Sequence, residues 1–256
     1  MYLCLSIIRM GVYTGVFIVF VVIGASVHLL FFMSQTRLLK WIAFFSKLWA
    51  RITCLILNIQ IRIEGDIPIT PGSLIVANHV GAPDIFVLGS IFSGFFVSKA
   101  EIADWPLFNW LARLGKTVFA DRSKRHQVKT LILEIQQRLK GDHSVILFPE
   151  AQATDGSNVM PFKSAVFEAA VLANRPVVPV EIHYHDDHRP TIAYYGDSFI
   201  NHIFVLLKTP RLSTTVTVMP SISADTNRQS LANKSFQVIH DKHNLTSPHN
   251  ASYNQK

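Results

Sequence analysis

The feature that most limits how this chain can fold is a long uncharged stretch near its N-terminus. Residues 11–33 contain no Asp, Glu, Lys or Arg. About 20 consecutive apolar residues suffice to cross a bilayer, and they must do so as a helix that satisfies its own backbone hydrogen bonds. A signal peptide is the alternative, because Arg9 precedes the stretch and residues 24–26 are small. Signal-peptide apolar regions usually span only about 7–15 residues. We therefore expect a retained membrane helix.

Charges on either side of this stretch predict its orientation. Arg9 stands alone before it, whereas Arg37, Lys40, Lys47 and Arg51 follow it. The positive-inside rule then places the following domain on the cytoplasmic side of the inner (cytoplasmic) membrane.

A second apolar and aromatic segment covers residues 38–59 and includes Lys47 and Arg51. Two interior charges disfavour a spanning helix, so we expect a helix in the membrane interface with its bases against lipid headgroups. An ordinary core helix is the alternative. Both segments together form an expected N-terminal unit, residues 1–60.

Composition excludes several classes of protein. The only two cysteines, Cys4 and Cys54, rule out a disulfide scaffold, and neither has metal-site spacing. The net charge of +7 beside a membrane segment suggests anionic lipid or an anionic substrate. Because no basic stripe is interleaved with aromatic residues, we expect no nucleic-acid partner.

Short apolar runs alternate with amphipathic ones after the membrane segments. This alternation predicts an α/β domain over residues 61–222, with a mostly parallel central sheet flanked by helices. The expected strands are 73–77, 95–98, 117–120, 144–148 and 177–182, with 192–195 and 214–219 extending the sheet. The expected helices are 84–91, 105–114, 123–140 and 164–173. Residues 223–256 read as a polar tail, with a short helix near 227–240 and a disordered end.

A histidine follows the first expected strand, in the sequence Asn78-His79-Val80-Gly81-Ala82-Pro83-Asp84. Active sites of open α/β sheets gather where strands end. Imidazole accepts a proton near neutral pH, and a carboxylate on its other nitrogen fixes the tautomer. No neighbouring serine or cysteine is an evident nucleophile. We therefore expect His79, steered by Asp84, to deprotonate a substrate hydroxyl.

Three further blocks follow strand-like runs, and each is ambiguous alone. Glu150 comes after a strand that Pro149 ends, and it is either an acceptor-binding group or a surface glutamate. Arg122 suits a phosphate or carboxylate, or else it pairs locally to cap the next helix. Pro179, inside the run Val177-Val178-Pro179-Val180, indicates an edge strand or a bend.

These blocks, in the order NHVGAPD, VFADR, LFPEAQATDG and RPVVPV, resemble the glycerolipid acyltransferase family. Its best-known members are the 1-acyl-glycerol-3-phosphate acyltransferases, and the resemblance covers residues 73–182. It implies a membrane-bound O-acyltransferase that moves a fatty acyl group from acyl-CoA or acyl carrier protein to the free hydroxyl of a lyso-phospholipid. The expected product is phosphatidate, formed without an acyl-enzyme intermediate and without a cofactor or metal.

The resemblance also implies residue roles. His79 would be the general base and Asp84 its orienting partner. Arg122 and Lys99 would bind the anionic head of the acceptor, and Glu150 would help to place it. Asn78, Pro149 and Pro179 belong to the same blocks and are expected to line the substrate site, with residues 177–180 on the acyl-donor side.

The third block departs from the family pattern F-P-E-G-T. Ala151 replaces the glycine, Gln152 replaces the threonine, and Ala153 stands where many phosphatidate-forming members have arginine. Glycine permits a positive φ, so the loop is expected to differ. A lost guanidinium removes a charge-assisted phosphate contact of about 1.5–3 kcal/mol. The alternatives are therefore a lyso-ornithine lipid acceptor, or a catalytically inactive lipid-binding scaffold.

A histidine-rich stretch, residues 183–188, resembles a metal cluster, since His183 and His185 would share one face of a strand. It leads into a turn at Arg189-Pro190, and no well-spaced further ligand is visible. The sequence therefore favours a polar connection.

Overall fold

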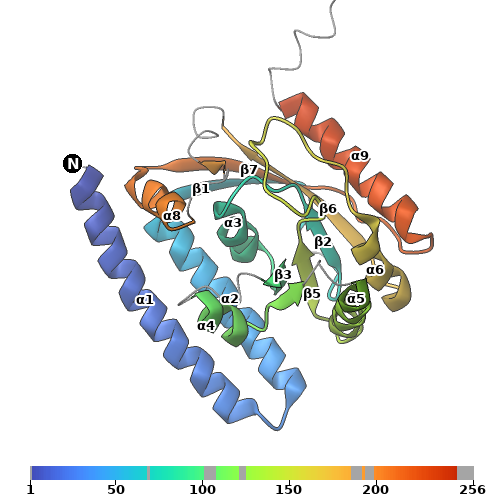
Figure 1. Ribbon diagram of the computed structural model, residues 1–256, viewed down its shortest axis with the longest axis horizontal. Coiled ribbons are helices and arrows are strands. Elements are labelled where there is room, and N and C mark those ends of the chain that lie inside the picture. The colour runs from blue at the N-terminus through green and yellow to red at the C-terminus, as the bar shows by residue number, and fades with distance from the viewer. Residues whose placement is uncertain are drawn as a thin grey trace, which may run out of the picture.

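The computed structural model describes residues 2–67, 70–100, 108–120, 125–185, 192–193 and 199–246. Within these ranges, seven strands form one sheet in the order β1-β7-β6-β2-β5-β3-β4 (Figure 1). Their bounds are β1 Ile59–Glu64, β2 Leu74–Ala77, β3 Gly94–Lys99, β4 Val118–Ala120, β5 Ser144–Leu147, β6 Val177–Tyr184 and β7 Leu212–Val218. Neighbouring strands are parallel except β6 and β7. The predicted α/β class with a mostly parallel sheet is confirmed.

Helices cover both faces of this sheet, which explains the uninterrupted apolar runs of β2 and β5. One face packs against α3 (Pro83–Ile91), through a core that includes Ile75, Ile146 and Val87. The other face packs against α5, α6 and α9, through a core that includes Leu74 and Val145. The helix bounds are α5 Arg125–Lys140, α6 Glu168–Ala173 and α9 Arg228–Thr246, with a 3-10 turn, η2, at Ser164–Phe167.

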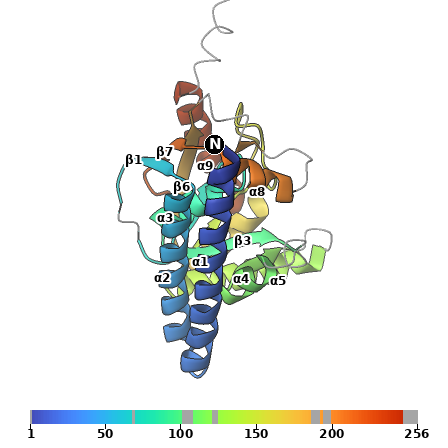
Figure 2. The same ribbon diagram turned by 90° about the vertical axis from the view of Figure 1, so that its left-hand side faces the viewer.

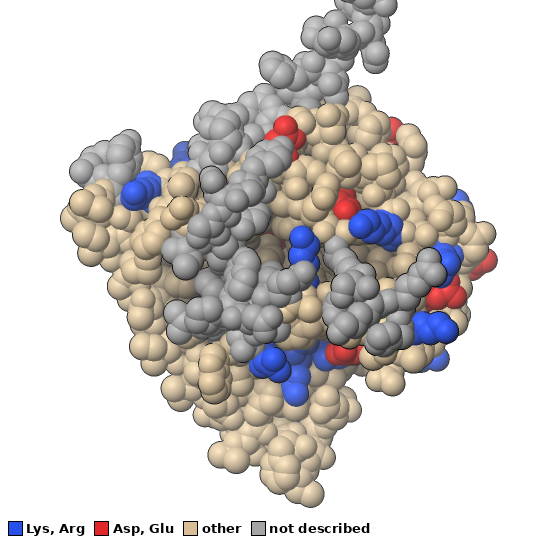
Figure 3. Space-filling model, in the orientation of Figure 1, with Lys and Arg blue, Asp and Glu red and all other residues tan. Residues whose placement is uncertain are grey.

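An antiparallel helical hairpin lies along one side of the domain (Figures 1 and 2). Its helices are α1 (Tyr2–Phe31) and α2 (Gln35–Ile56), and α1 also contacts α4 (Phe108–Leu114) and α8 (Phe199–Lys208). By length and composition, α1 can cross a membrane. Large apolar side chains are exposed at the hairpin tip, namely Leu29, Leu30, Phe32 and Met33. Figure 3 shows no charged side chain at this lower end of the molecule on the face that it displays.

Arg9 does not flank the apolar helix as the sequence suggests. It lies within α1, is buried, and donates hydrogen bonds to the carbonyls of Leu207 at 3.2 Å and Pro210 at 3.0 Å. These carbonyls lie at and just beyond the end of α8, where a helix presents unpaired acceptors and partial negative charge. Arg9 therefore ties α1 to the α/β domain.

The two bases inside α2 also have protein partners, which corrects the expectation that they face lipid headgroups. The Lys47 ammonium donates to the carbonyl of Ile91 at 2.6 Å, and Arg51 Nε donates to the carbonyl of Ser90 at 3.0 Å. Both acceptors are at the C-terminus of α3, where cations are favoured. On this side α2 packs as a core helix, the alternative that the sequence left open.

Pro179 lies in an inner strand, so the expectation of an edge strand is wrong. β6 is flanked by β7 and β2, and Pro179 pairs in register with Val76 of β2. Its carbonyl accepts the N–H of Met219 at 3.0 Å, directly beyond the end of β7. Proline has no N–H to donate, and Pro179 lies just where the β6–β7 hydrogen-bond ladder ends. The proline therefore interrupts no continuous strand pairing.

Two elements, β1 at the sheet edge and α8, were not predicted, and two expected segments differ from expectation. Of the strand expected over 192–195, Ile192 is helical and buried, and residues 194 and 195 lie outside the described residues. The first part of the expected polar tail is α9, which packs on β6 and buries Leu231, Ala232 and Ile239.

Candidate active site

His79 lies two residues beyond the end of β2, in the loop that leads into α3. Its Nδ1 is 2.7 Å from Oδ2 of Asp84. Pro83 occupies the first turn of α3, which suits its fixed φ and places Asp84 at the helix N-terminus, where a carboxylate is stabilised. The Asp84 side chain is 0% exposed and that of His79 is 22% exposed. The predicted pair therefore meets, with only its imidazole accessible.

The Asp84 carboxylate is held by more than the histidine. Its Oδ2 accepts the backbone N–H groups of Val80 at 2.7 Å and Gly81 at 3.0 Å. Its Oδ1 accepts the hydroxyl of Tyr184, from β6, at 2.8 Å. Because this fixed carboxylate accepts from His79 Nδ1, that nitrogen carries the ring proton, and Nε2 is left as the basic atom.

The orientation of the His79 ring is set by β5. Phe148, the residue after that strand, stacks on the imidazole with ring centroids 4.1 Å apart and an angle of 13° between the planes. Gly81 is required in the same loop, because a Cβ there would lie 2.1 Å from the carbonyl oxygen of Ile192. Backbone packing therefore permits no side chain at this position.

Glu150 joins the third sequence block to the first through a hydrogen bond. Its Oε1 accepts the N–H of His79 at 2.8 Å, and its Oε2 accepts the N–H of Met160 at 2.9 Å. Glu150 is only 4% exposed, which excludes the surface-loop alternative. Burial raises the pKa of its carboxyl to about 7, although these two hydrogen bonds oppose the rise. Both oxygens are engaged with the backbone, so the geometry favours a positioning role over direct contact with an acceptor.

The altered third block keeps a left-handed backbone without a glycine. Ala151 has φ of +70°, a conformation that a Cβ makes unfavourable. The loop continues to Thr154, whose N–H donates to the carbonyl of His79 at 2.9 Å. The turn at Ala151 is therefore left-handed despite its Cβ, and the loop that follows it packs against the His79 loop.

Asn78 and Pro149 also lie at the carboxyl edge of the sheet. The Asn78 amide exchanges two hydrogen bonds with the backbone of Ile182, at 2.9 and 2.8 Å. This continues the β2–β6 pairing beyond Ala77. Pro149 is buried, and its carbonyl accepts the N–H of Lys163 at 3.0 Å. Both residues hold the loops that surround His79.

The expected anion-binding residues are placed only in part. Lys99 is exposed at the carboxyl end of β3, the edge of the sheet that also carries His79. Arg122 lies outside the described residues.

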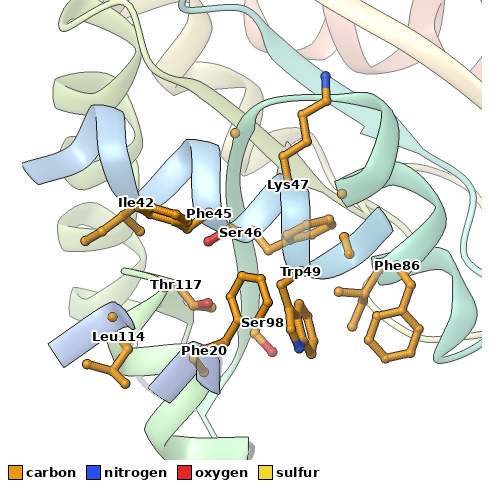
Figure 4. A pocket seen from close by; sticks show the side chains of 18 of the residues that line it. Phe20, Ile42, Phe45, Ser46, Lys47, Trp49, Phe86, Ser98, Leu114 and Thr117 are labelled. Atoms are coloured by element: carbon orange, nitrogen blue, oxygen red, sulfur yellow. The ribbon is translucent and has the colours of Figure 1, made fainter. Parts of the chain in front are cut away.

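An apolar cavity of about 200 Å³ lies beside the His79 loop (Figure 4). It is enclosed by α1, α2, α3, β3 and α4, and Ala82 and Ile85 bring the dyad loop and the first turn of α3 to its wall. Trp49 and Phe86 meet edge to face at 5.4 Å along another wall. Other lining side chains are Phe20, Val27, Ile42, Phe45, Phe96 and Leu114.

Sequence reasoning missed Tyr184, Phe148 and the contribution of α1 and α2 to the cavity. Tyr184 lies 100 residues beyond Asp84, so no local spacing reveals their contact. Its one signal is a tyrosine close to the end of an expected buried strand, since buried tyrosine hydroxyls usually find a partner.

A partly exposed histidine on a βα loop, its contact with a buried carboxylate and an adjacent apolar cavity are compatible with acyl transfer onto a hydroxyl. Comparison with known proteins agrees, because a sequence model of the Acyltransferase family matches residues 58–183. The lyso-ornithine lipid O-acyltransferase of Brucella abortus is 32% identical over 200 residues, which cover 71% of this chain and 75% of that protein. That of Rhizobium meliloti is 32% identical over 193 residues, 69% of this chain and 66% of that protein.

Two further similarities are informative. The 1-acyl-sn-glycerol-3-phosphate acyltransferase of Neisseria meningitidis is 32% identical over 132 residues, 51% of this chain and 52% of that protein. The crystal structure of the 1-acyl-sn-glycerophosphate acyltransferase PlsC from Thermotoga maritima superposes with a TM-score of 0.72 and 20% identity, covering 97% of this chain and 98% of that one. The latter shows the shared fold. The chain belongs to the acyltransferase family.

Proposed function

We propose that this protein is a membrane-associated O-acyltransferase that esterifies the free hydroxyl of a lyso-lipid. The observation that carries the proposal is the 2.7 Å contact between His79 Nδ1 and the buried Asp84 carboxylate. This contact leaves Nε2 as a base on the accessible side of the pair. The apolar cavity next to Ala82 provides the companion site that a fatty chain requires.

In the proposed reaction, His79 Nε2 removes the proton from the acceptor hydroxyl as the oxygen attacks the thioester carbonyl of acyl-CoA or acyl carrier protein. Asp84 stabilises the imidazolium that forms. The tetrahedral intermediate collapses by breaking the carbon–sulfur bond, and the proton on His79 passes to the departing thiolate. The products are an ester and a free thiol, and no covalent enzyme intermediate is needed.

The helical hairpin would bring this site to its substrates. Exposed apolar side chains along α1 and at the hairpin tip suit contact with lipid tails. The cavity is enclosed partly by α1 and α2, so a fatty chain could pass between membrane and cavity along these helices. The cytoplasmic orientation of the domain is part of this proposal, and of the bases that predict it Arg37 and Lys40 are exposed beside the hairpin tip.

For the acceptor, the third block favours a lyso-ornithine lipid. Ala153, half-buried beside the Thr154 contact to His79, supplies no guanidinium for a phosphate. The relatives from Brucella abortus and Rhizobium meliloti carry that acceptor in their names. Lysophosphatidate is the second candidate, because the Neisseria meningitidis relative is named for it and Lys99 is exposed at the same sheet edge.

The test is acyl transfer by the full chain purified in detergent. Each lyso-lipid is paired with acyl-CoA and with acyl carrier protein, and a folded His79→Ala variant serves as control. We expect ester formation by the wild type with at least one acceptor, and loss of it in the variant. Equal inactivity of both proteins with every pair would favour the lipid-binding scaffold.

A kinetic measurement tests the role proposed for Arg122 as a ligand for the head of the acceptor. Arg122→Ala should raise the acceptor KM more than the donor KM. An equal change in both would refute that role.

A further inference from the structure

A second cluster of ionisable side chains lies on the opposite face of β6 from the dyad. Successive residues of a strand point to opposite faces. Ile182 and Tyr184 belong to the core on the α3 side of the sheet, where the Tyr184 hydroxyl contacts Asp84. Glu181 and His183 alternate with them and meet His243 of α9, which packs against β6 (Figure 1).

The three side chains converge on one point. One potential ligand atom from each of Glu181, His183 and His243 lies within 4.8 Å of the other two. Glu181 Oε1 is 3.3 Å from Nδ1 of His243 and 3.9 Å from Nδ1 of His183. In a tetrahedral zinc site with bonds of about 2.0–2.1 Å, neighbouring ligand atoms lie roughly 3.3–3.5 Å apart. Small side-chain rotations would therefore bring the three groups to coordinating distance.

One carboxylate oxygen of this cluster is buried without a hydrogen-bond partner among the described residues. Glu181 is 0% exposed and His243 is 2% exposed. Among the described residues, Glu181 Oε2 has no hydrogen-bond partner. A buried carboxylate oxygen without a partner is costly, and buried charges are normally paired or coordinate a metal.

We propose that Glu181, His183 and His243 bind a divalent transition metal, with zinc the expected ion. Two imidazoles and one carboxylate form a donor set that suits zinc, and a fourth position remains for water. The metal would join α9 to β6, the strand whose other face positions Asp84 through Tyr184. The sequence favoured a polar connection at His183 because no further ligand follows nearby, whereas the fold supplies His243 from 60 positions downstream.

The test uses the full chain purified in detergent through a tag without histidine, stripped with a chelator and then dialysed against zinc. We expect close to one zinc per chain by elemental analysis and a higher unfolding temperature than that of the stripped protein. Cobalt in place of zinc should give the visible absorption bands of a tetrahedral nitrogen and oxygen site. If the wild type holds no zinc and shows no such bands, the cluster is a set of hydrogen-bonded side chains without a metal, and the proposal is overturned.

Matched variants locate the metal. His243→Ala should weaken zinc binding by at least the roughly 10–100-fold that loss of an outer partner costs a metal site. His240→Ala, which removes a half-exposed histidine one turn away on α9, should bind zinc like the wild type. Equal zinc binding by both variants would place the metal elsewhere. If His243→Ala fails to fold, the stoichiometry and cobalt spectrum of the wild type decide the question alone.

Discussion

The Tyr184 hydroxyl donates a 2.8 Å hydrogen bond to the one Asp84 oxygen that does not contact His79. Both partners are buried, and they belong to different elements, β6 and α3. This bond connects the dyad to the centre of the sheet, so the position of the carboxylate depends on β6. The Tyr184 hydroxyl bonds to Asp84 on the side away from His79, so we expect it to position the carboxylate.

Tyr184→Phe should therefore impair both stability and turnover. Removal of the hydroxyl leaves Asp84 Oδ1 buried without its donor, at a cost of about 1–3 kcal/mol in the free energy of unfolding. A less firmly held carboxylate orients His79 less well, so we expect kcat to fall roughly tenfold with little change in KM. Denaturant unfolding and steady-state kinetics measure the two effects.

Tyr13→Phe is the control, because it removes a tyrosine hydroxyl from the helical hairpin, where the ring packs near Trp49. It should leave kcat unchanged. A Tyr184→Phe enzyme with wild-type kcat would show that the hydroxyl serves stability alone.

Asp84→Asn tests how far catalysis depends on the negative charge beside His79. The amide oxygen can take the position of Oδ2, where it still accepts the N–H groups of Val80 and Gly81, so the ring tautomer is kept while the charge that stabilises the imidazolium is lost. We expect kcat to fall by about 10²–10⁴-fold with the fold retained, toward the rate of His79→Ala. The double variant should be no slower than either single variant, because the pair acts as a unit. If the loss of kcat in the double variant equals the product of the two single losses, the two residues act independently and the coupling is contradicted.

The sequence predicted those contacts of the site that join residues close together in the chain. His79 and Asp84 are five residues apart, one in the loop after β2 and the other in the first turn of α3, so their spacing predicted their contact. Glu150 and Asn78 were placed at the correct edge of the sheet, but their hydrogen bonds to the backbone of distant loops have no signature in sequence. The ligands of the proposed metal site come from β6 and α9, and only tertiary packing brings them together.

The same limit explains the errors in the fold. Strands β2 to β6 have strong apolar runs and were predicted. β1 is an edge strand in which three of the six residues, IQIRIE, are exposed, and the seven apolar residues among the ten of α8 do not distinguish helix from strand. The charge rules applied to the sequence assign water or lipid as the partner of Arg9, Lys47 and Arg51. In the fold, these side chains instead donate hydrogen bonds to carbonyls at helix C-termini.

Ala151→Gly should stabilise the protein. Alanine at φ of +70° carries a penalty of about 1–2 kcal/mol that glycine avoids, offset in part by the greater freedom of glycine in the unfolded chain. The expected net gain is about 0.5–1 kcal/mol in the free energy of unfolding. Ala153→Gly, two residues further on at a position without positive φ, should instead lose stability. If both variants lose the same amount, the left-handed turn at residue 151 is not strained.

Glu150 gives the protein a distinct pH dependence of stability. Burial raises the pKa of its carboxyl from 4.5 to about 7. Between these values the folded carboxyl keeps a proton that the unfolded chain has lost, so the free energy of unfolding falls as pH rises from about 4.5 to 7. Above pH 7 the effect is constant, with a total of about 3 kcal/mol.

Glu150→Gln removes this titration, so its stability relative to the wild type should improve steadily from pH 4.5 to 7. Urea unfolding of both proteins at half-unit intervals measures the difference and cancels the contributions of other groups. Parallel curves would show that the carboxyl does not bind its proton more tightly in the folded state.

Ala82→Leu tests whether the cavity beside the dyad holds the acyl chain. Ala82 lines the cavity three residues after His79 and is only half-buried, so a larger side chain can enter the space without displacing the core. We expect kcat/KM for a palmitoyl donor to fall on the order of tenfold or more, because each tenfold corresponds to only about 1.4 kcal/mol of lost transition-state binding. A butyryl donor, too short to fill the cavity, should react at the wild-type rate. If both donors slow equally, the substitution has disturbed the dyad, and if neither slows, the acyl chain lies outside this cavity.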